Sequence, residues 1–132
     1  MSGKDSIIGR SIIIQKTTGE KISCATIYQQ SFDQTSDLRA DLIEGKIKGY
    51  ISFQQIKGKE TSIFASLSGL NDYVGPFFFH IHNFQITNGD CASTGGHYDP
   101  LQYIIFFFFF HSFFEFQDFI EFFLFFKKKI II

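Results

Sequence analysis

The chain has 132 residues, which is one domain or parts of two, because domains usually contain about 100–200 residues. The net charge of −1 argues against a nucleic-acid-binding surface, and a hydrophobic fraction of 45% argues against general disorder. Phe occurs 20 times and Trp not at all, and 13 of the Phe residues lie after residue 100. Residues 101–132 therefore have a composition of their own.

The first 28 residues predict two paired strands. Residues 6–15 (SIIGRSIIIQ) are rich in Ile and predict a strand with a bend at the Gly-Arg pair. Residues 17–21 (TTGEK) carry a turn signal, and residues 22–28 (ISCATIY) alternate apolar and small polar side chains. That alternation predicts a second strand that pairs with the first. Residues 29–38 are mostly polar and predict a linker.

A second group of short strands follows the linker. Residues 42–54 (LIEGKIKGYISFQ) and 61–67 (TSIFASL) show strand-type alternation, and residues 77–82 (FFFHIH) predict a further strand. Polar or Gly-containing turns separate these segments, and the Asn88-Gly89 pair opens another turn. Short strands between such turns, with no helical period before residue 100, predict an all-β antiparallel sandwich or barrel.

The Phe-rich, low-complexity tail admits three interpretations. Its apolar stretch at 101–126, followed by three lysines, formally resembles a membrane span with a basic flank. The acids Glu115, Asp118 and Glu121 would be costly inside a membrane. Runs of Phe, Lys and Ile are also typical of AT-rich non-coding sequence that has been translated. A mistranslated tail, a membrane or amphipathic helix, and a packed structural tail therefore all stay open.

The N-terminus and the cysteines bear on the cellular compartment. The chain does not open with a basic segment and an apolar run, so no secretory signal peptide is predicted in it. The two cysteines, Cys24 and Cys91, are too far apart for the paired motif of a zinc knuckle. They form either one disulfide, which would indicate an oxidising compartment, or two buried thiols.

Three histidines are candidate metal ligands. His80 and His82 project from the same face of a predicted strand, because strand side chains alternate. Paired imidazoles suit copper, zinc, iron or nickel, although such a pair is more often polar surface or hydrogen-bonded histidine. His97 follows 15 residues after His82, far enough for a loop to return it to the same ion. This third histidine favours a metal site.

Residues 75–100 (GPFFFHIHNFQITNGDCASTGGHYDP) resemble the signature of the copper/zinc superoxide dismutase family. In that family the matching positions are two copper ligands, a disulfide cysteine and the histidine that bridges copper to zinc. Here these positions are His80, His82, Cys91 and His97. Residues 44–53 and 66–70 resemble the family's opening strands and the turn before the metal strand. The Gly-Pro-Phe lead-in is nearest to the copper-only extracellular branch, in which the domain is repeated.

The first 28 residues resemble the other end of the same family. Residues 6–15 are similar to the late strand that carries the fourth copper histidine, and residues 19–27 to the closing strand with the second disulfide cysteine. The resemblance therefore places Cys24 at the partner position of Cys91. The bridge would form within this chain, as in a permuted domain, or each cysteine would belong to a different repeat. The resemblance also implies a division of the chain into the C-terminal strands of one dismutase-like repeat (1–28), a linker (29–38), the N-terminal half of a second repeat (39–100) and the tail (101–132).

The sequence departs from the family at several functional positions. Gln15 stands where the family has its fourth copper histidine, and Lys21 where it has the arginine that guides superoxide to copper. Lysine keeps the positive charge but loses the planar fork, so anion guidance would survive in part. The positions of the zinc ligands fall on Ile105, Phe114 and Gln117, none of which is a credible zinc ligand. Copper is therefore expected, and zinc is not.

The resemblance implies a partial Greek-key β-barrel or sandwich of the dismutase type. It implies an oxidoreductase that disproportionates superoxide to dioxygen and hydrogen peroxide. Copper would be held by His80, His82 and His97, and Lys21 would attract the anion. Two other functions stay open: a non-catalytic copper-binding or structural dismutase-like module, and a membrane-attached protein that acts through its tail.

The resemblance also sets expectations about partners and location. Superoxide is the expected substrate, and neighbouring dismutase-like repeats are the expected protein partners. No nucleic acid is expected, and a membrane only if the tail is genuine. The expected location is extracellular.

Overall fold

The computed structural model describes residues 6–30, 35–56, 61–70, 77–98 and 119–126. Its elements are almost all strands, and a short 3₁₀ helix, η2, spans Cys91–Thr94. The strands are β1 (Ser11–Lys16), β2 (Lys21–Gln29), β3 (Thr35–Leu42), β4 (Glu44–Gly45), β5 (Lys48–Ile56), β6 (Thr61–Ser68), β7 (Phe77–His82) and β8 (Phe119–Phe126).

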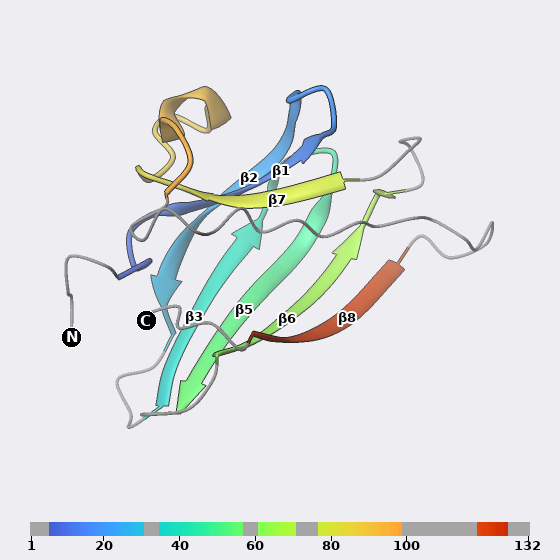
Figure 1. Cartoon of the computed structure of the whole chain (residues 1–132). Coiled ribbons are helices and arrows are strands. Elements are labelled where there is room, and N and C mark those ends of the chain that lie inside the picture. The colour runs from blue at the N-terminus through green and yellow to red at the C-terminus, as the bar shows by residue number, and fades with distance from the viewer. Residues whose placement is uncertain (1–5, 31–34, 57–60, 71–76, 99–118, 127–132) are drawn as a thin grey trace.

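The strands form one curled antiparallel sheet. Its order is β7-β1-β2-β3-β5-β6-β8, and β4 adds a short pairing to β2. Figure 1 shows the sheet curling into an open half-barrel, with η2 lying at the end of the sheet formed by β7, β1 and β2. The predicted all-β fold of partial-barrel type is confirmed.

The core lies on the inner face of this curled sheet. Strand alternation directs every second side chain inward, and six of the strands contribute to a single buried apolar cluster. Phe53 of β5 and Phe77 of β7 are its largest fully buried side chains. Burial of such side chains is the main stabilising contribution to a sheet of this kind.

The strand β3 begins inside the stretch that the sequence predicts to be a linker. From residue 37 onward its charged side chains alternate with three buried apolar ones, Leu38, Ala40 and Leu42. This period of two places the apolar residues in the core, and β3 then pairs with both β2 and β5. The assignment of the two flanking segments to separate repeats stays a prediction.

The predicted strand at residues 6–15 is shorter in the structure. Residues 6–10 form a turn, and β1 starts only at Ser11. Gly9 adopts a φ of 75°, which glycine tolerates and other residues rarely adopt, and its amide donates to the carbonyl of Ile27 at 2.9 Å. This turn carries the chain across the end of β2 before β1 begins.

Part of the Phe-rich tail is described. Residues 119–126 form β8, which pairs along its whole length with β6, from Thr61 opposite Phe126 to Ser68 opposite Phe119. This part of the tail is therefore a strand and not a helix. Across the part of the chain that the structure describes, no helix is long and apolar enough to cross a membrane. Ile105, Phe114 and Gln117, which stand at the family's zinc-ligand positions, lie outside the described residues.

The register of β7, β1 and β2 places the candidate site residues on one face. Residues directly opposite in antiparallel strands share a face. His80 is opposite Ile13, and Ile13 is opposite Cys24. Gln15 is opposite both Phe78 of β7 and Lys21 of β2. The intervening residues of β1 and β7 belong to the core cluster, so this histidine face lies on the other side of the sheet.

Candidate metal site

The third histidine returns to β7 through backbone hydrogen bonds. Tyr98 N donates to Ile81 O at 2.7 Å, and Asn83 N donates to Gly96 O at 3.0 Å. These bonds form an isolated β-bridge between His82 and His97. The structure therefore brings together His80, His82 and His97, which the sequence singles out as candidate ligands.

The three imidazole rings form a compact cluster. The ring centroids of His80 and His97 are 4.2 Å apart, those of His82 and His97 5.0 Å, and those of His80 and His82 6.4 Å. His80 and His82 are buried, whereas His97 is exposed. The rings of His80 and His97 are stacked, with only 8° between their planes.

Because of this stacking, the three rings are not arranged to coordinate one metal ion. Parallel stacked rings direct their nitrogen lone pairs side by side and not toward one point. Among the described residues, accordingly, no group of three or more His, Cys, Asp or Glu is arranged to hold an ion. Binding would require the His97 ring to turn, which its exposure permits. The donor chemistry fits copper, since imidazole is a common copper ligand.

Burial keeps the two strand histidines neutral at pH 7. Burial, followed by the nearby rings of His97 and His82, lowers the pKa of His80 from 6.5 to about 4. Burial is also the largest cause that lowers the pKa of His82, assisted by Lys21 and His97 and opposed by a hydrogen bond to Gly95. A neutral imidazole is the form that binds a metal ion.

A hydrogen bond assigns the tautomer of His82. Its Nδ1 lies 2.8 Å from the carbonyl oxygen of Gly95. Because a carbonyl only accepts, Nδ1 carries the ring proton and Nε2 carries the lone pair. That Nε2 atom is buried and has no hydrogen-bond partner among the described residues. A lone pair held in this way is available to a metal ion, and an outer hydrogen bond of this kind is typical of metal-binding histidines.

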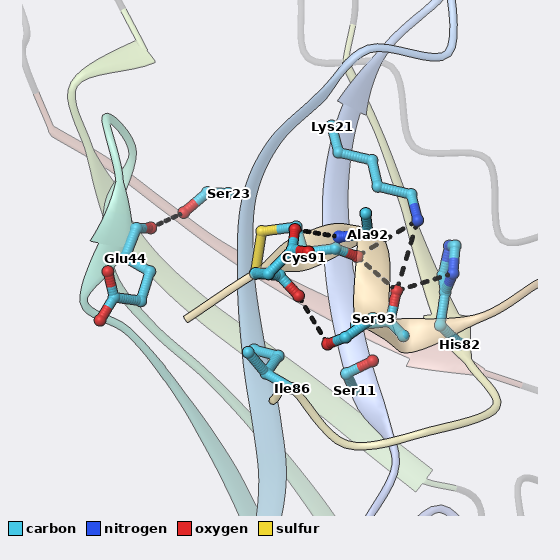
Figure 2. The surroundings of a disulfide bond; sticks show 12 residues. Ser11, Lys21, Ser23, Glu44, His82, Ile86, Cys91, Ala92 and Ser93 are labelled. Atoms are coloured by element: carbon cyan, nitrogen blue, oxygen red, sulfur yellow. Dashed lines mark hydrogen bonds between the residues drawn. A yellow bond between two sulfur atoms is a disulfide. The ribbon is translucent and has the colours of Figure 1, made fainter. Parts of the chain in front are cut away.

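Lys21 reaches the same loop from β2. Its Nζ donates to the Cys91 carbonyl at 3.2 Å and contacts Thr94 Oγ1 at 3.4 Å. Thr94 Oγ1 in turn lies 3.3 Å from His82 Nδ1. Figure 2 shows the Lys21 ammonium and the His82 ring converging on the turn that begins at Cys91. Sequence reasoning missed Thr94, because its contact with Lys21 joins residues 73 positions apart.

The disulfide fixes this turn to the sheet. Cys24 of β2 and Cys91 of η2 are bonded, with their Cα atoms 5.7 Å apart (Figure 2). This confirms the pairing that the family resemblance implies. Within the turn, Asp90 Oδ1 accepts from Ala92 N at 2.8 Å, and Ser93 Oγ donates to Asp90 O at 2.6 Å. The loop before His97 is therefore held both covalently and by its own hydrogen bonds.

Arg10 is a second residue that sequence reasoning missed. Its Nη1 donates to Asn83 O at 3.0 Å, and its guanidinium carbon lies 3.5 Å from the centre of the Tyr98 ring. Asn83 follows His82 in the chain and Tyr98 follows His97. Arg10 thus holds together the two backbone segments that carry these histidines. Its place at the end of the turn at residues 6–10 offers no sequence signal for this role.

The fold and the histidine cluster define an all-β protein with three neighbouring imidazoles beside a disulfide. In a comparison with known protein families, residues 47–104 match the model of copper/zinc superoxide dismutase (SODC). This segment, less than half of the chain, is therefore similar to the copper/zinc superoxide dismutase family.

A curated relative is similar to this chain over part of its length. The chain is 36% identical over 56 residues to "Cell surface superoxide dismutase [Cu-Zn] 6" of Candida albicans. The match covers 42% of this chain and 18% of the relative, so the chain spans only a minor part of that protein's length. No solved structure matches the chain.

Proposed function

We propose that this chain is a dismutase-like copper-binding protein that disproportionates superoxide to dioxygen and hydrogen peroxide. His80, His82 and His97 would hold the copper ion. The observation that carries the proposal is the approach of three imidazoles, with ring centroids 4.2–6.4 Å apart. In addition, the buried His82 Nε2 has no hydrogen-bond partner within the described part of the chain. Leaving a buried acceptor without a partner is costly, and a bound cation would offset that cost.

The chain's own residues prepare the ligands. Copper, when bound, supplies the one-electron exchange that the reaction requires. His80 is neutral at pH 7, and the Gly95 carbonyl holds the proton of His82 on Nδ1. The third ligand, His97, is exposed, so its ring can rotate to meet the metal ion. Two fixed ligands and one adjustable ligand are compatible with an open position for a small anion.

Lys21 would guide the superoxide anion. Its ammonium is held next to the site by the Cys91 carbonyl and the Thr94 hydroxyl. A cation fixed at this position raises the local concentration of small anions, and this attraction weakens with ionic strength. Lysine lacks the planar fork of arginine, so a smaller rate advantage is expected.

Copper alone is proposed as the metal. The positions that correspond to zinc ligands hold Ile105, Phe114 and Gln117, and none of these side chains binds zinc well. Among the family's zinc-ligand positions, a zinc ion would therefore find only His97, which it would share with copper.

The proposed location is extracellular or at the cell surface. The relative from Candida albicans is named as a cell surface protein, and a disulfide persists in oxidising compartments. We also propose that residues 1–28 and 39–100 come from the ends of two adjacent dismutase-like repeats. The support for this proposal is the resemblance of each segment to a different end of the family's domain; in this chain β1 of the first segment pairs with β7 of the second.

A second candidate function is a non-catalytic copper-binding module. It is favoured by Gln15, which stands on the histidine face where the family has its fourth copper histidine, and by the stacked rings of His80 and His97. A site with three histidine ligands would bind copper more weakly and exchange electrons less well than a complete one.

Superoxide turnover by copper-loaded protein separates the two functions. The dismutase proposal expects turnover above that of the same protein without copper, lost in a His80→Ala/His82→Ala double variant and lowered by Lys21→Met. The matched control is His111→Ala, which changes a histidine that corresponds to no ligand position. Stoichiometric copper binding without turnover would reject the enzyme and support the module. Absence of copper binding would reject both.

A further inference from the structure

The side chain of Arg10 starts from a well-anchored point at the end of the turn at residues 6–10. The backbone there is bonded to β2 in both directions: Gly9 N donates to Ile27 O at 2.9 Å, and Ile27 N donates to Arg10 O at 2.8 Å. The Nε atom of Arg10 donates to the Ser6 carbonyl at 2.8 Å. Because Arg10 is also half-buried, its guanidinium has a defined position relative to β2.

The far end of the guanidinium joins two segments that are distant from each other in the chain. Its Nη1 donates to Asn83 O at 3.0 Å, and its carbon lies 3.5 Å from the centre of the Tyr98 ring. A planar guanidinium can stack on an aromatic face and donate hydrogen bonds in its own plane at the same time. Arg10 makes both kinds of contact, and so it links the residue after His82 to the residue after His97.

The sheet holds these two segments to different degrees. The strand β7, which ends at His82, pairs with β1 at each of its six positions. His97 and Tyr98 belong to no strand in the described part of the chain, and an isolated β-bridge to His82 joins them to β7. The Asn83 side chain adds exposed hydrogen bonds to the carbonyls of Gly96 and His97, at 3.2 and 3.3 Å. The contact of Arg10 with Tyr98 therefore matters more to the His97 segment than to β7.

We propose that Arg10 is a positioning residue for the third copper ligand: it holds the backbone of His97 against the end of β7, so that only the exposed His97 ring has to turn. The inference rests on the proposed copper function, which gives the position of His97 its purpose. The clamp itself is a property of the metal-free protein and can be measured there.

Loss of the guanidinium has a specific consequence for the His97 segment. The segment would separate from β7 more often, because one of its attachments would be gone. Two amides would then exchange with water: that of Tyr98, which donates to Ile81 O at 2.7 Å, and that of Asn83, which donates to Gly96 O at 3.0 Å. Each separation also moves His97 away from the other two histidines, so the site would offer three ligands for a smaller fraction of the time.

Two variants, matched in chemistry, test the clamp. Arg10→Met keeps an apolar stem and removes the guanidinium. Arg39→Met is the control, because the guanidinium carbon of Arg39 also stands over a tyrosine ring, 3.9 Å from the centre of Tyr50. Arg39 lies on β3, which β1 and β2 separate from β7. If Arg10→Met does not fold, Arg10→Lys takes its place with the same expected direction, since lysine keeps the charge but lacks the planar fork.

The first readout is amide hydrogen exchange in the metal-free protein, followed by NMR. We expect exchange at the Tyr98 and Asn83 amides to be about 10-fold faster in Arg10→Met, as for the loss of one cation–π contact and one hydrogen bond. The amides of β5, which lies between β3 and β6, report general stability and should change less. Arg39→Met should leave the Tyr98 and Asn83 rates unchanged. Unchanged rates in Arg10→Met, or an equal acceleration throughout β5, would overturn the proposal.

The second readout is the affinity for Cu(II) alone, measured by competition with a chelator. Groups that orient metal ligands typically change affinity by about 10- to 100-fold, and we expect a loss of about 10-fold in Arg10→Met and none in Arg39→Met. In a His97→Ala background, Arg10→Met should cause no further loss, because the ligand that Arg10 positions is already absent.

An equal loss with and without His97 would show a merely structural role for Arg10 and overturn the proposal. A wild-type chain that binds no Cu(II) would instead reject the proposed function, and the exchange rates would still decide whether Arg10 holds the His97 segment.

Discussion

The replacement of Cys91 by serine would show how much the disulfide contributes to folding. The bond joins residues 67 positions apart and so closes a long loop of the unfolded chain. A loop of that length corresponds to about 4 kcal/mol of stabilisation by the chain-entropy relation. Domains of this size have a total free energy of unfolding of about 5–15 kcal/mol. Cys91→Ser should therefore leave a marginally stable protein.

Urea unfolding followed by circular dichroism measures this loss. Serine at position 91 avoids placing a hydroxyl at Cys24, which is fully buried, so the measured change reports the bond and not a buried polar group. Wild-type protein in reductant is the control and should unfold at the same urea concentration as the variant. A variant within about 1 kcal/mol of the oxidised wild type would refute the reasoning, because the bridge would then constrain little of the unfolded chain.

Three further changes test the core, the sheet and the charges. Phe53→Ala, at a core side chain with 1% exposure, should lower the free energy of unfolding by about 3–5 kcal/mol in urea titration, and a loss below about 1 kcal/mol would contradict the assigned core. Gly49→Ala should lower the melting temperature, because the added Cβ would lie 2.0 Å from the Ser66 carbonyl oxygen. The control Gly96→Ala adds a Cβ in open space and should leave the melting temperature unchanged, so equal melting temperatures of the two variants would contradict the β5–β6 register. Burial raises the pKa of Asp41, but the hydrogen bonds that its carboxylate accepts from Tyr28 and Arg39 outweigh burial, so the pKa is lowered from its ordinary value. The ionised Asp41 should therefore make the wild type more stable than Asp41→Asn by up to about 1 kcal/mol, as for a surface pair. This difference in the free energy of unfolding is present above the pKa of Asp41 in the unfolded chain, and it is lost as the pH falls through the lower pKa of Asp41 in the folded protein. A difference that persists below that pKa would contradict this assignment.

Local sequence patterns were sufficient to predict many of the strands. The alternating and Ile-rich segments became β1, β2 and β6, and the Phe-His segment became β7. The turn expected at Asn88 and Gly89 is present, with φ angles of 53° and 68°. The strand β3 was missed because its charged residues resemble the composition of a linker. The signal that could have found it is the alternation of Leu38, Ala40 and Leu42 with charged side chains.

The candidate site was predictable only in part. The shared face of His80 and His82 follows from strand alternation, and the disulfide and the return of His97 followed from the family resemblance. The roles of Thr94 and Arg10 depend on contacts between residues 73 positions apart in the chain. Such contacts arise from the packing of η2 and the turn at residues 6–10 against β2 and β7, and no local pattern encodes them.

Pulsed electron paramagnetic resonance of the Cu(II)-loaded chain tests the central claim, a copper site built from three histidines, most directly. The account predicts one Cu(II) per chain, coupled to the nitrogens of three imidazoles, with one coupling lost in each of His80→Ala, His82→Ala and His97→Ala. Spectra that are unchanged in these variants, or a wild-type chain that retains no Cu(II), would contradict it.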